Sequence, residues 1–191
     1  MIIVSDTSPI ANLIQIGALN LLHQLFGRVI IPPTVEREIL ALKKFGVDLT
    51  AFENSSWIEI ISPIDIPLLN QIKNDLDEGE SEAIVVAKEL HADYILIDER
   101  LGTKKAQEIG LQTVGLLGVL IKAKNEKHIE KVKPILDALI DKEHKLNKSA
   151  FFLTHRHIGH IGHIGHIVFS LKKIALKRFM YKIYVSYVPM C

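Results

Sequence analysis

The chain has 191 residues, 48% hydrophobic and 24% charged, which is enough apolar surface for a core and excludes a wholly disordered protein. A single cysteine, Cys191, excludes an intrachain disulfide framework and a cysteine-based zinc site. The net charge of +1 conceals an asymmetry: residues 1–143 carry 15 basic and 22 acidic side chains, whereas residues 144–191 carry 8 basic and no acidic ones. This composition predicts an acidic domain followed by a basic extension.

The first 143 residues alternate short apolar runs with helical patterns. In chain order we expect a strand at 1–4, a helix at 11–26 broken by Gly17, a strand at 28–31, a helix at 34–42, a strand at 57–61, helices at 68–76 and 79–90, a strand at 94–97, a helix at 103–109, a strand at 112–116, and helices at 119–124 and 129–140. Strands separated by helices predict βαβ units. The expected fold class is α/β, with a central parallel sheet and helices on both faces.

The last part of the chain has a different character. Residues 157–167 repeat His-Ile-Gly, and a glycine at every third position costs a helix about 1 kcal/mol each. Residues 171–188 are apolar and basic, as in an amphipathic helix or strand. We therefore expect a domain at 1–150 and an extension at 151–191 that is either disordered or not native to the domain. A basic extension could attract phosphates, or alternatively a membrane surface.

Missing motifs narrow the chemistry. The sequence has no Gly-x-x-x-x-Gly-Lys-Ser/Thr, no Gly-x-Gly-x-x-Gly after the first strand, no Gly-x-Ser-x-Gly and no His-Glu-x-x-His. The histidines of residues 1–143, His23, His91 and His128, are far apart in the sequence. No signal peptide and no membrane-spanning window of about 20 apolar residues is visible. We expect a cytoplasmic protein without histidine-based catalysis.

The remaining candidates for a functional site are carboxylates at the ends of strands and in the first turns of helices. Asp6 follows the first expected strand and Asp98 a later one, and parallel strands place such residues at one edge of the sheet. Glu38 and Glu82 lie one turn into helices that begin at that edge. Each of these acids could instead be an ordinary helix cap or turn residue. If these acids converge, a cation must neutralise their mutual repulsion. Oxygen ligands favour Mg²⁺ or Mn²⁺, and such an ion can activate a water molecule that attacks a phosphodiester.

Four segments, in this order along the chain, resemble the motifs of a known family: Ile-Ile-Val-Ser-Asp-Thr-Ser-Pro-Ile at 2–10, Ile-Pro-Pro-Thr-Val-Glu-Arg-Glu-Ile at 31–39, Leu-Asp-Glu-Gly-Glu-Ser-Glu-Ala-Ile at 76–84 and Tyr-Ile-Leu-Ile-Asp-Glu-Arg at 94–100. Together with residues 110–120 they resemble the PIN-domain family, in its DUF3368 branch of VapC-like proteins, over roughly residues 1–150. The resemblance implies a three-layer α/β/α fold and an acidic pocket for Mg²⁺ or Mn²⁺. It also implies cleavage of single-stranded RNA, often as the toxin of a toxin–antitoxin pair.

The resemblance also implies roles for individual residues. The catalytic acids would be Asp6, Glu38, Glu82 and Asp98, and the metal ligands Asp6, Glu82, Asp98 and Glu99. Thr7 and Ser8 match small hydroxyl residues that support the first acid or a water. Many active relatives have Thr-x-Asp in the last motif, where this chain has Ile97-Asp98-Glu99, so either of the last two acids could be the ligand.

The remaining expectations concern partners. Arg100, Lys104 and Lys105 follow Asp98 and are candidates for contacts with RNA phosphates, or alternatively part of a solvated helix face. The resemblance implies single-stranded RNA as substrate, an antitoxin protein as partner and a homodimer as the common assembly of relatives. The alternative function is a catalytically silent PIN-like module that binds RNA or a protein partner without cutting. Its binding should survive chelation and an Asp6→Ala change.

Overall fold

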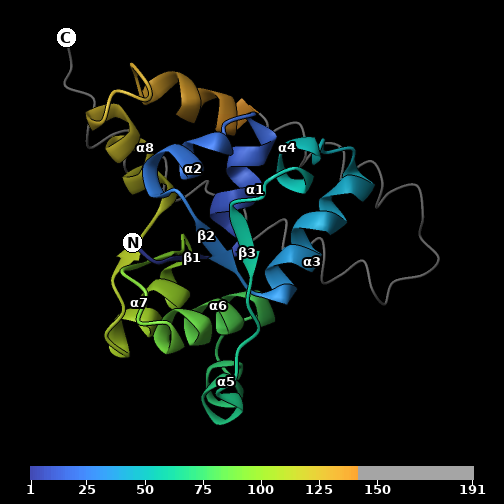
Figure 1. The fold of residues 1–191 in the computed structure, drawn as a ribbon, viewed down its shortest axis with the longest axis vertical. Helices are drawn as coiled ribbons and strands as arrows, with labels where there is room; N and C mark the ends of the chain where they lie inside the picture. The colour runs from blue at the N-terminus through green and yellow to red at the C-terminus, as the bar shows by residue number, and fades with distance from the viewer. Residues whose placement is uncertain (142–191) are drawn as a thin grey trace. The chain divides into compact units, whose positions relative to one another are not determined.

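A parallel sheet forms the centre of the fold (Figure 1). This computed structural model describes residues 1–141 of the chain. The five strands of the sheet are β1 (Ile3–Ser5), β2 (Val29–Ile31), β3 (Ile58–Ile60), β4 (Tyr94–Leu96) and β5 (Thr113–Val114). They lie in the order β3-β2-β1-β4-β5, and all of the pairings are parallel. The predicted α/β class with a central parallel sheet is therefore confirmed.

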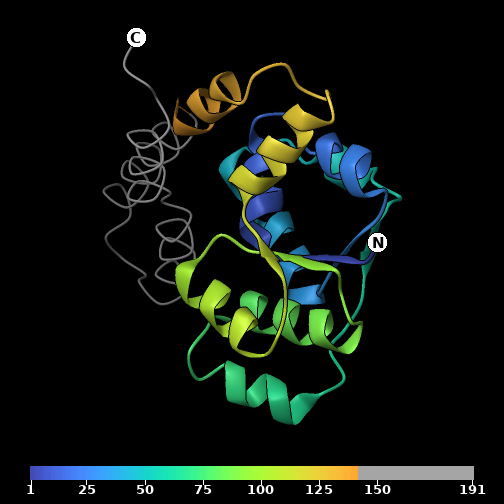
Figure 2. The ribbon, with the colours of Figure 1, turned by 90° about the vertical axis from the view of Figure 1, so that its left-hand side faces the viewer.

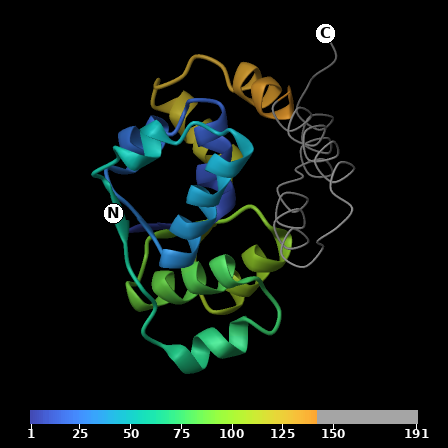
Figure 3. The same cartoon turned by 90° about the vertical axis from the view of Figure 1, so that its right-hand side faces the viewer.

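Helices connect the strands and cover both faces of the sheet. They are α1 (Thr7–Gln15), α2 (Asn20–Phe26), α3 (Pro33–Ala41), the 3-10 helix η1 (Leu42–Phe45), α4 (Thr50–Glu53), α5 (Ile66–Ile72), α6 (Glu78–Glu89), α7 (Arg100–Glu108) and α8 (Leu116–Asn125). Helices α5, α6 and α7 lie on one side of the sheet, and α1, α2 and α8 lie on the other (Figure 2 and Figure 3). Within the described residues, none of these helices is long and apolar enough to cross a membrane.

Alternating residues of the inner strands β1, β2 and β4 are largely buried on the two faces of the sheet, whereas the edge strands β3 and β5 are only partly buried. Val4, Ile30 and Ile95 belong to the apolar cluster that contains Ile84 and its neighbours in α6. Strand residues adjacent to these, such as Ile3, are also fully buried and point to the other face. Short runs of apolar, largely β-branched residues form the strands here because both faces of the sheet are covered.

The observed elements differ from the predicted ones at several boundaries. The helix expected at 11–26 is two helices, because Gly17 adopts a φ of +69° that a continuous helix does not allow, and α1 begins earlier, at Thr7. Helices η1 and α4 were not expected. The strand expected at 112–116 is only Thr113–Val114, because Gly115 already caps α8. The predicted division at residue 150 and the predicted extension involve residues outside the described part and stay predictions.

The order of the strands reverses in the middle of the sheet. The chain adds β2 and β3 on one side of β1, and then crosses over to add β4 and β5 on the other. Strands β1 and β4 are therefore neighbours at which the strand order reverses, the usual ligand-binding position in an open α/β sheet. Asp6 lies directly after β1, and its backbone N–H donates to the Leu96 carbonyl at the end of β4 (2.9 Å).

Candidate functional site

Asp6 occupies the centre of the carboxyl edge of the sheet. It precedes α1 in extended conformation, and the residue is only 4% exposed. Burial, followed by the negative charges of Asp77 and Glu38, raises the pKa of Asp6 to about 8, against the opposing effect of the Thr7 and Ser8 backbone N–H groups. The carboxyl of Asp6 is thus a buried group on which the negative charges of two other acids act.

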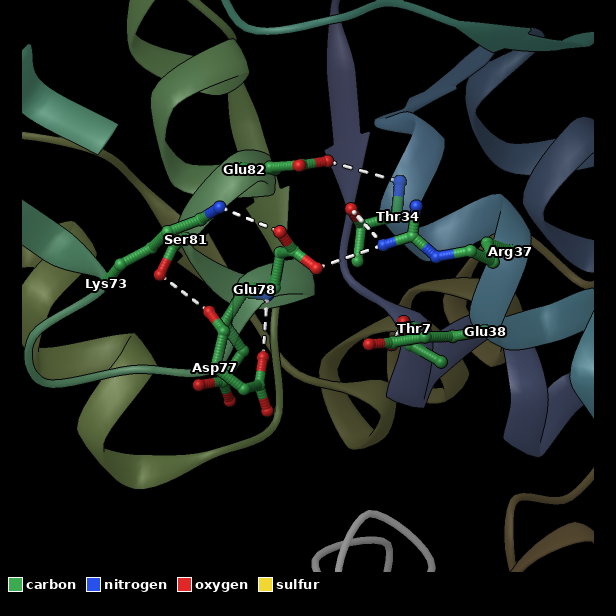
Figure 4. A network of polar contacts seen from close by, with 10 residues as sticks. Thr7, Thr34, Arg37, Glu38, Lys73, Asp77, Glu78, Ser81 and Glu82 are labelled. Atoms are coloured by element: carbon green, nitrogen blue, oxygen red, sulfur yellow. Dashed lines mark hydrogen bonds and ion pairs between the residues drawn. The ribbon is translucent and has the colours of Figure 1, made fainter. Parts of the chain in front are cut away.

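Glu38 lies beside Asp6 because α3 crosses the beginning of α1. The Thr7 hydroxyl donates to Oε2 of Glu38 (2.5 Å), which joins the first residue of α1 to the middle of α3 (Figure 4). Burial raises the pKa of Glu38; the Thr7 hydrogen bond and the Arg37 charge oppose this rise, while Asp77 adds to it. The carboxylate also rests on the backbone of α6, since a Cβ at Gly79 would lie 3.0 Å from Oε2.

Asp77 is the third member of this group, and it was not among the site residues predicted from the sequence. It is the N-cap of α6: its Oδ1 accepts from the Glu80 N–H (3.0 Å), and its carbonyl accepts from the Ser81 hydroxyl (2.6 Å). Its charge raises the pKa of both Asp6 and Glu38. The sequence signal was an Asp directly before the acidic first turn of a helix, which is also the pattern of an ordinary cap.

The other two predicted catalytic acids bind the beginnings of helices. Oε2 of Glu82 accepts from the backbone N–H of Thr34 in the first turn of α3 (3.2 Å, Figure 4). Oδ1 of Asp98 accepts from the N–H of Leu116, the first residue of α8 (2.8 Å). Burial raises the pKa of Asp98 to about 6, and the Leu116 hydrogen bond opposes this rise. Oδ2 of Asp98 is buried and has no hydrogen-bond partner among the described residues.

The remaining predicted residues have separate positions. Glu99 is the half-buried N-cap residue of α7, and its side chain makes no capping hydrogen bond. Nζ of Lys105 donates to Oδ2 of Asp75 (2.9 Å), and Nζ of Lys104 lies 3.7 Å from Oε1 of Glu108. Arg100 is exposed and makes no hydrogen bond or ion pair within residues 1–141. The predicted roles of these residues stay predictions.

The donor set suits a hard divalent cation, although the side chains are held apart. All of the candidate ligands are carboxylates, and the oxygen Oδ2 of Asp98 is buried without a partner among the described residues. Across the described part of the chain, no three Asp, Glu, His or Cys side chains are grouped closely enough to hold a metal ion. Thr7, Thr34 and Leu116 each donate to only one of the two oxygens of Glu38, Glu82 and Asp98, so a shared ion would require these side chains to approach one another but would not require the hydrogen bonds to break.

Comparisons with known proteins identify the family. The solved structure of a PilT N-terminus domain protein from the hyperthermophilic archaeon Sulfolobus solfataricus has 20% identity and a TM-score of 0.44, over 64% of this chain and 93% of that chain. A search of the curated proteins found no match. DUF3368, a family of PIN domains, matches residues 2–156. PIN domains are generally nucleases and generally use divalent metal ions. Because the match spans most of the chain, this protein belongs to the DUF3368 family of PIN domains.

Proposed function

We propose that the chain is a metal-dependent endoribonuclease that hydrolyses phosphodiesters of single-stranded RNA. The observation that carries the proposal is the group formed by Asp6, Glu38 and Asp77 at the point where the strand order reverses. Negative charges that raise the pKa of a buried acid, as those of Asp77 and Glu38 do for Asp6, destabilise the fold unless a cation or protons neutralise them. In a family of proteins that are generally nucleases, such a group is best explained by a metal that works on phosphates.

The carboxylates supply the ligands in this proposal. Asp6, Glu82 and Asp98, with Glu99 as the alternative last ligand, would hold Mg²⁺ or Mn²⁺, Glu38 would complete the site, and Asp77 is a further candidate beside Asp6. When bound, the ion would neutralise these acids and acidify the attacking water. Thr7 would orient Glu38 through its hydroxyl, and the N–H groups of Thr7 and Ser8 would hold the ionised form of Asp6.

Cleavage of an unstructured RNA panel by the full chain tests the proposal. Mn²⁺-dependent cleavage should disappear with EDTA, and Asp6→Asn should lower it about a hundredfold, since Asn keeps the shape of the ligand but loses its charge. Asp65→Asn is the matched control, because Asp65 also caps a helix, α5, by accepting from the Leu68 N–H (2.9 Å), but is not one of the acids that shift the pKa of Asp6 or Glu38. This control should keep its activity.

The opposite outcome would support the silent module. If RNA binding survives both EDTA and Asp6→Ala, and if calorimetry detects no Mn²⁺ binding, the nuclease proposal is wrong. The replacement of Thr-x-Asp by Ile97-Asp98-Glu99 is the observation that favours this alternative. A toxin role with an antitoxin partner and a homodimer are proposals that rest on the family resemblance, and a cytoplasmic location is a proposal that rests on the sequence alone.

A further inference from the structure

Arg37 lies at the rim of the acidic site. It comes directly before Glu38 on α3, and its Nη2 donates to the Thr34 hydroxyl (3.0 Å) and to Oε2 of Glu78 on α6 (3.0 Å). Figure 4 shows the guanidinium reaching from α3 towards Glu78, on the same side of α3 as Glu82. The side chain is nevertheless 65% exposed. It is thus a cation held in place by two hydrogen bonds, yet open to solvent.

The guanidinium keeps donors for a further partner. An arginine has five N–H donors, and the two contacts of Arg37 both use Nη2. Its Nε and Nη1 atoms donate to no group among residues 1–141. The positive charge also opposes the rise in the pKa of Glu38, so it acts directly on the acidic group.

Glu78 forms ion pairs with two cations, so these three side chains together carry more positive than negative charge. Glu78 accepts from Arg37 and, through Oε1, from Lys73 at the end of α5 (2.8 Å). A single carboxylate therefore serves two cations. The cation Arg28, in contrast, has a glutamate, Glu59, to itself (3.0 Å). The Arg37–Glu78–Lys73 group is therefore locally positive. It lies within residues 1–143, whose net charge is −7.

We propose that Arg37, assisted by Lys73, binds a backbone phosphate of the single-stranded RNA and so positions the strand over the acids. This inference rests on the proposed function, since it takes RNA as the substrate. A guanidinium suits a phosphate because its planar, fixed donors match the phosphate oxygens. The neighbouring acids would repel the strand, and a cation on each side of Glu78 offsets that repulsion where the strand must enter.

Binding of a fluorescein-labelled oligouridylate to the full chain, followed by anisotropy in EDTA over a range of salt concentrations, tests this inference without cleavage. Arg37→Gln should weaken binding about tenfold and reduce the slope of log K against log salt by about 0.7, the value of one phosphate contact in a single strand. Arg28→Gln is the matched control, since Arg28 is also exposed (54%) and pairs with one glutamate. It should change neither quantity.

Glu78→Gln supplies a test in the other direction. Removing the carboxylate frees both cations for the strand, so binding should tighten and the salt slope should increase. Circular dichroism of each variant checks that the fold is retained. The inference is wrong if Arg37→Gln leaves the slope unchanged, if Arg28→Gln lowers it equally, or if the unaltered chain does not bind at low salt.

The Mn²⁺ cleavage assay separates this inference from the proposed function. Cleavage with an unchanged slope in Arg37→Gln would overturn the phosphate contact and leave the nuclease proposal standing. A slope that depends on Arg37 without any cleavage would support the phosphate contact and overturn the nuclease proposal.

Discussion

Four acids of the site lie against the N-termini of helices. Asp6 precedes α1 and Asp77 caps α6, while Asp98 binds the first N–H of α8 and Glu82 an N–H in the first turn of α3. The unpaired N–H groups and the dipole of a helix favour negative charge at its N-terminus. The fold therefore lowers the cost of these acids without a cation. For Asp6 this is not sufficient, because burial still raises its pKa to about 8.

The raised pKa of Asp6 predicts a pH-dependent stability of the metal-free protein. The folded chain keeps a proton up to about pH 8 that the unfolded chain, in which this carboxyl has its ordinary pKa of 3.8, releases near pH 4. Stability should therefore be greatest at the acidic end and fall as the pH rises through this window, by up to about 1.4 kcal/mol per pH unit. Asp98, with its pKa of about 6, should add to the fall only between about pH 4 and 6.

Urea unfolding in EDTA at several pH values measures this effect. Asp6→Asn removes the titrating group, so its stability should depend less on pH above about pH 6, where Asp98 is already ionised. A metal-free protein whose stability stays level or rises between about pH 6 and 8 would contradict the prediction. Added Mn²⁺ should stabilise the unaltered chain more at the alkaline end, because the ion competes with the proton for Asp6.

Part of the candidate site's geometry was predictable from the sequence. Asp6 and Asp98 were expected at the carboxyl edge of the sheet because an acid that follows a buried strand of a parallel sheet lies there. Asp77 was not found, because an acid before a helix is usually a cap and its nearness to Asp6 depends on how α6 packs. Lys105 illustrates the same limit, since only tertiary structure brings Asp75, thirty residues earlier, to its ammonium group.

Helices α3 and α6 together form the wall of the site. They are joined where Glu38 rests against Gly79, where Arg37 binds Glu78, and where Glu82 accepts from the N–H of Thr34. Figure 4 shows the polar contacts between these two helices. The position of Glu38 therefore depends on a residue without a side chain at the beginning of α6.

Gly79→Ala tests this close approach. Alanine is the better helix former by about 1 kcal/mol, and Gly79 has no positive φ, so the helix itself should tolerate the change. The new Cβ would lie 3.0 Å from Oε2 of Glu38 and displace it from Thr7. Cleavage should fall about tenfold, as expected when a positioning interaction is removed, while the urea midpoint changes little.

Gly118→Ala is the control for this substitution. Gly118 is also a helical glycine, in α8, and a Cβ there would meet a methyl group of Val114 (2.9 Å) rather than an acid. It should leave cleavage unchanged. Equal activity in Gly79→Ala and the unaltered chain would show that Glu38 does not depend on this contact.

The strands were easier to predict than the helix boundaries. A buried parallel strand needs an apolar run on both faces, and β2 shows one that ends at Pro32-Pro33. Pro33 begins α3, where its missing N–H costs nothing. Helices η1 and α4 are only four residues long, too short to show a helical period in the sequence.

The charge of the whole chain is divided unevenly along its length. Residues 1–143 have a net charge of −7, and several of their exposed cations are already paired with acids, as in Lys43–Glu53 (2.9 Å). Such a domain repels a polyanion at long range, and the Arg37–Glu78–Lys73 group can offset this only locally. Residues 144–191 carry 8 basic and no acidic side chains, but lie outside the described part of the chain. If RNA is the substrate, this basic segment is a second source of attraction.

Neutralising the basic segment in the full chain tests that attraction. Replacing five of its 8 cations, Lys172, Lys173, Lys177, Arg178 and Lys182, by Gln should weaken oligouridylate binding and reduce the salt slope by about 0.7 for each phosphate that the segment no longer binds. The set of cleaved positions should not change, because the acids of the site lie within residues 1–141.

A control with the same change of net charge replaces five exposed lysines of the acidic domain, Lys43, Lys44, Lys88, Lys124 and Lys127. If both variants bind with the same reduced affinity, net charge alone acts on the RNA; a larger reduction in the first variant means that the basic segment itself contacts the strand.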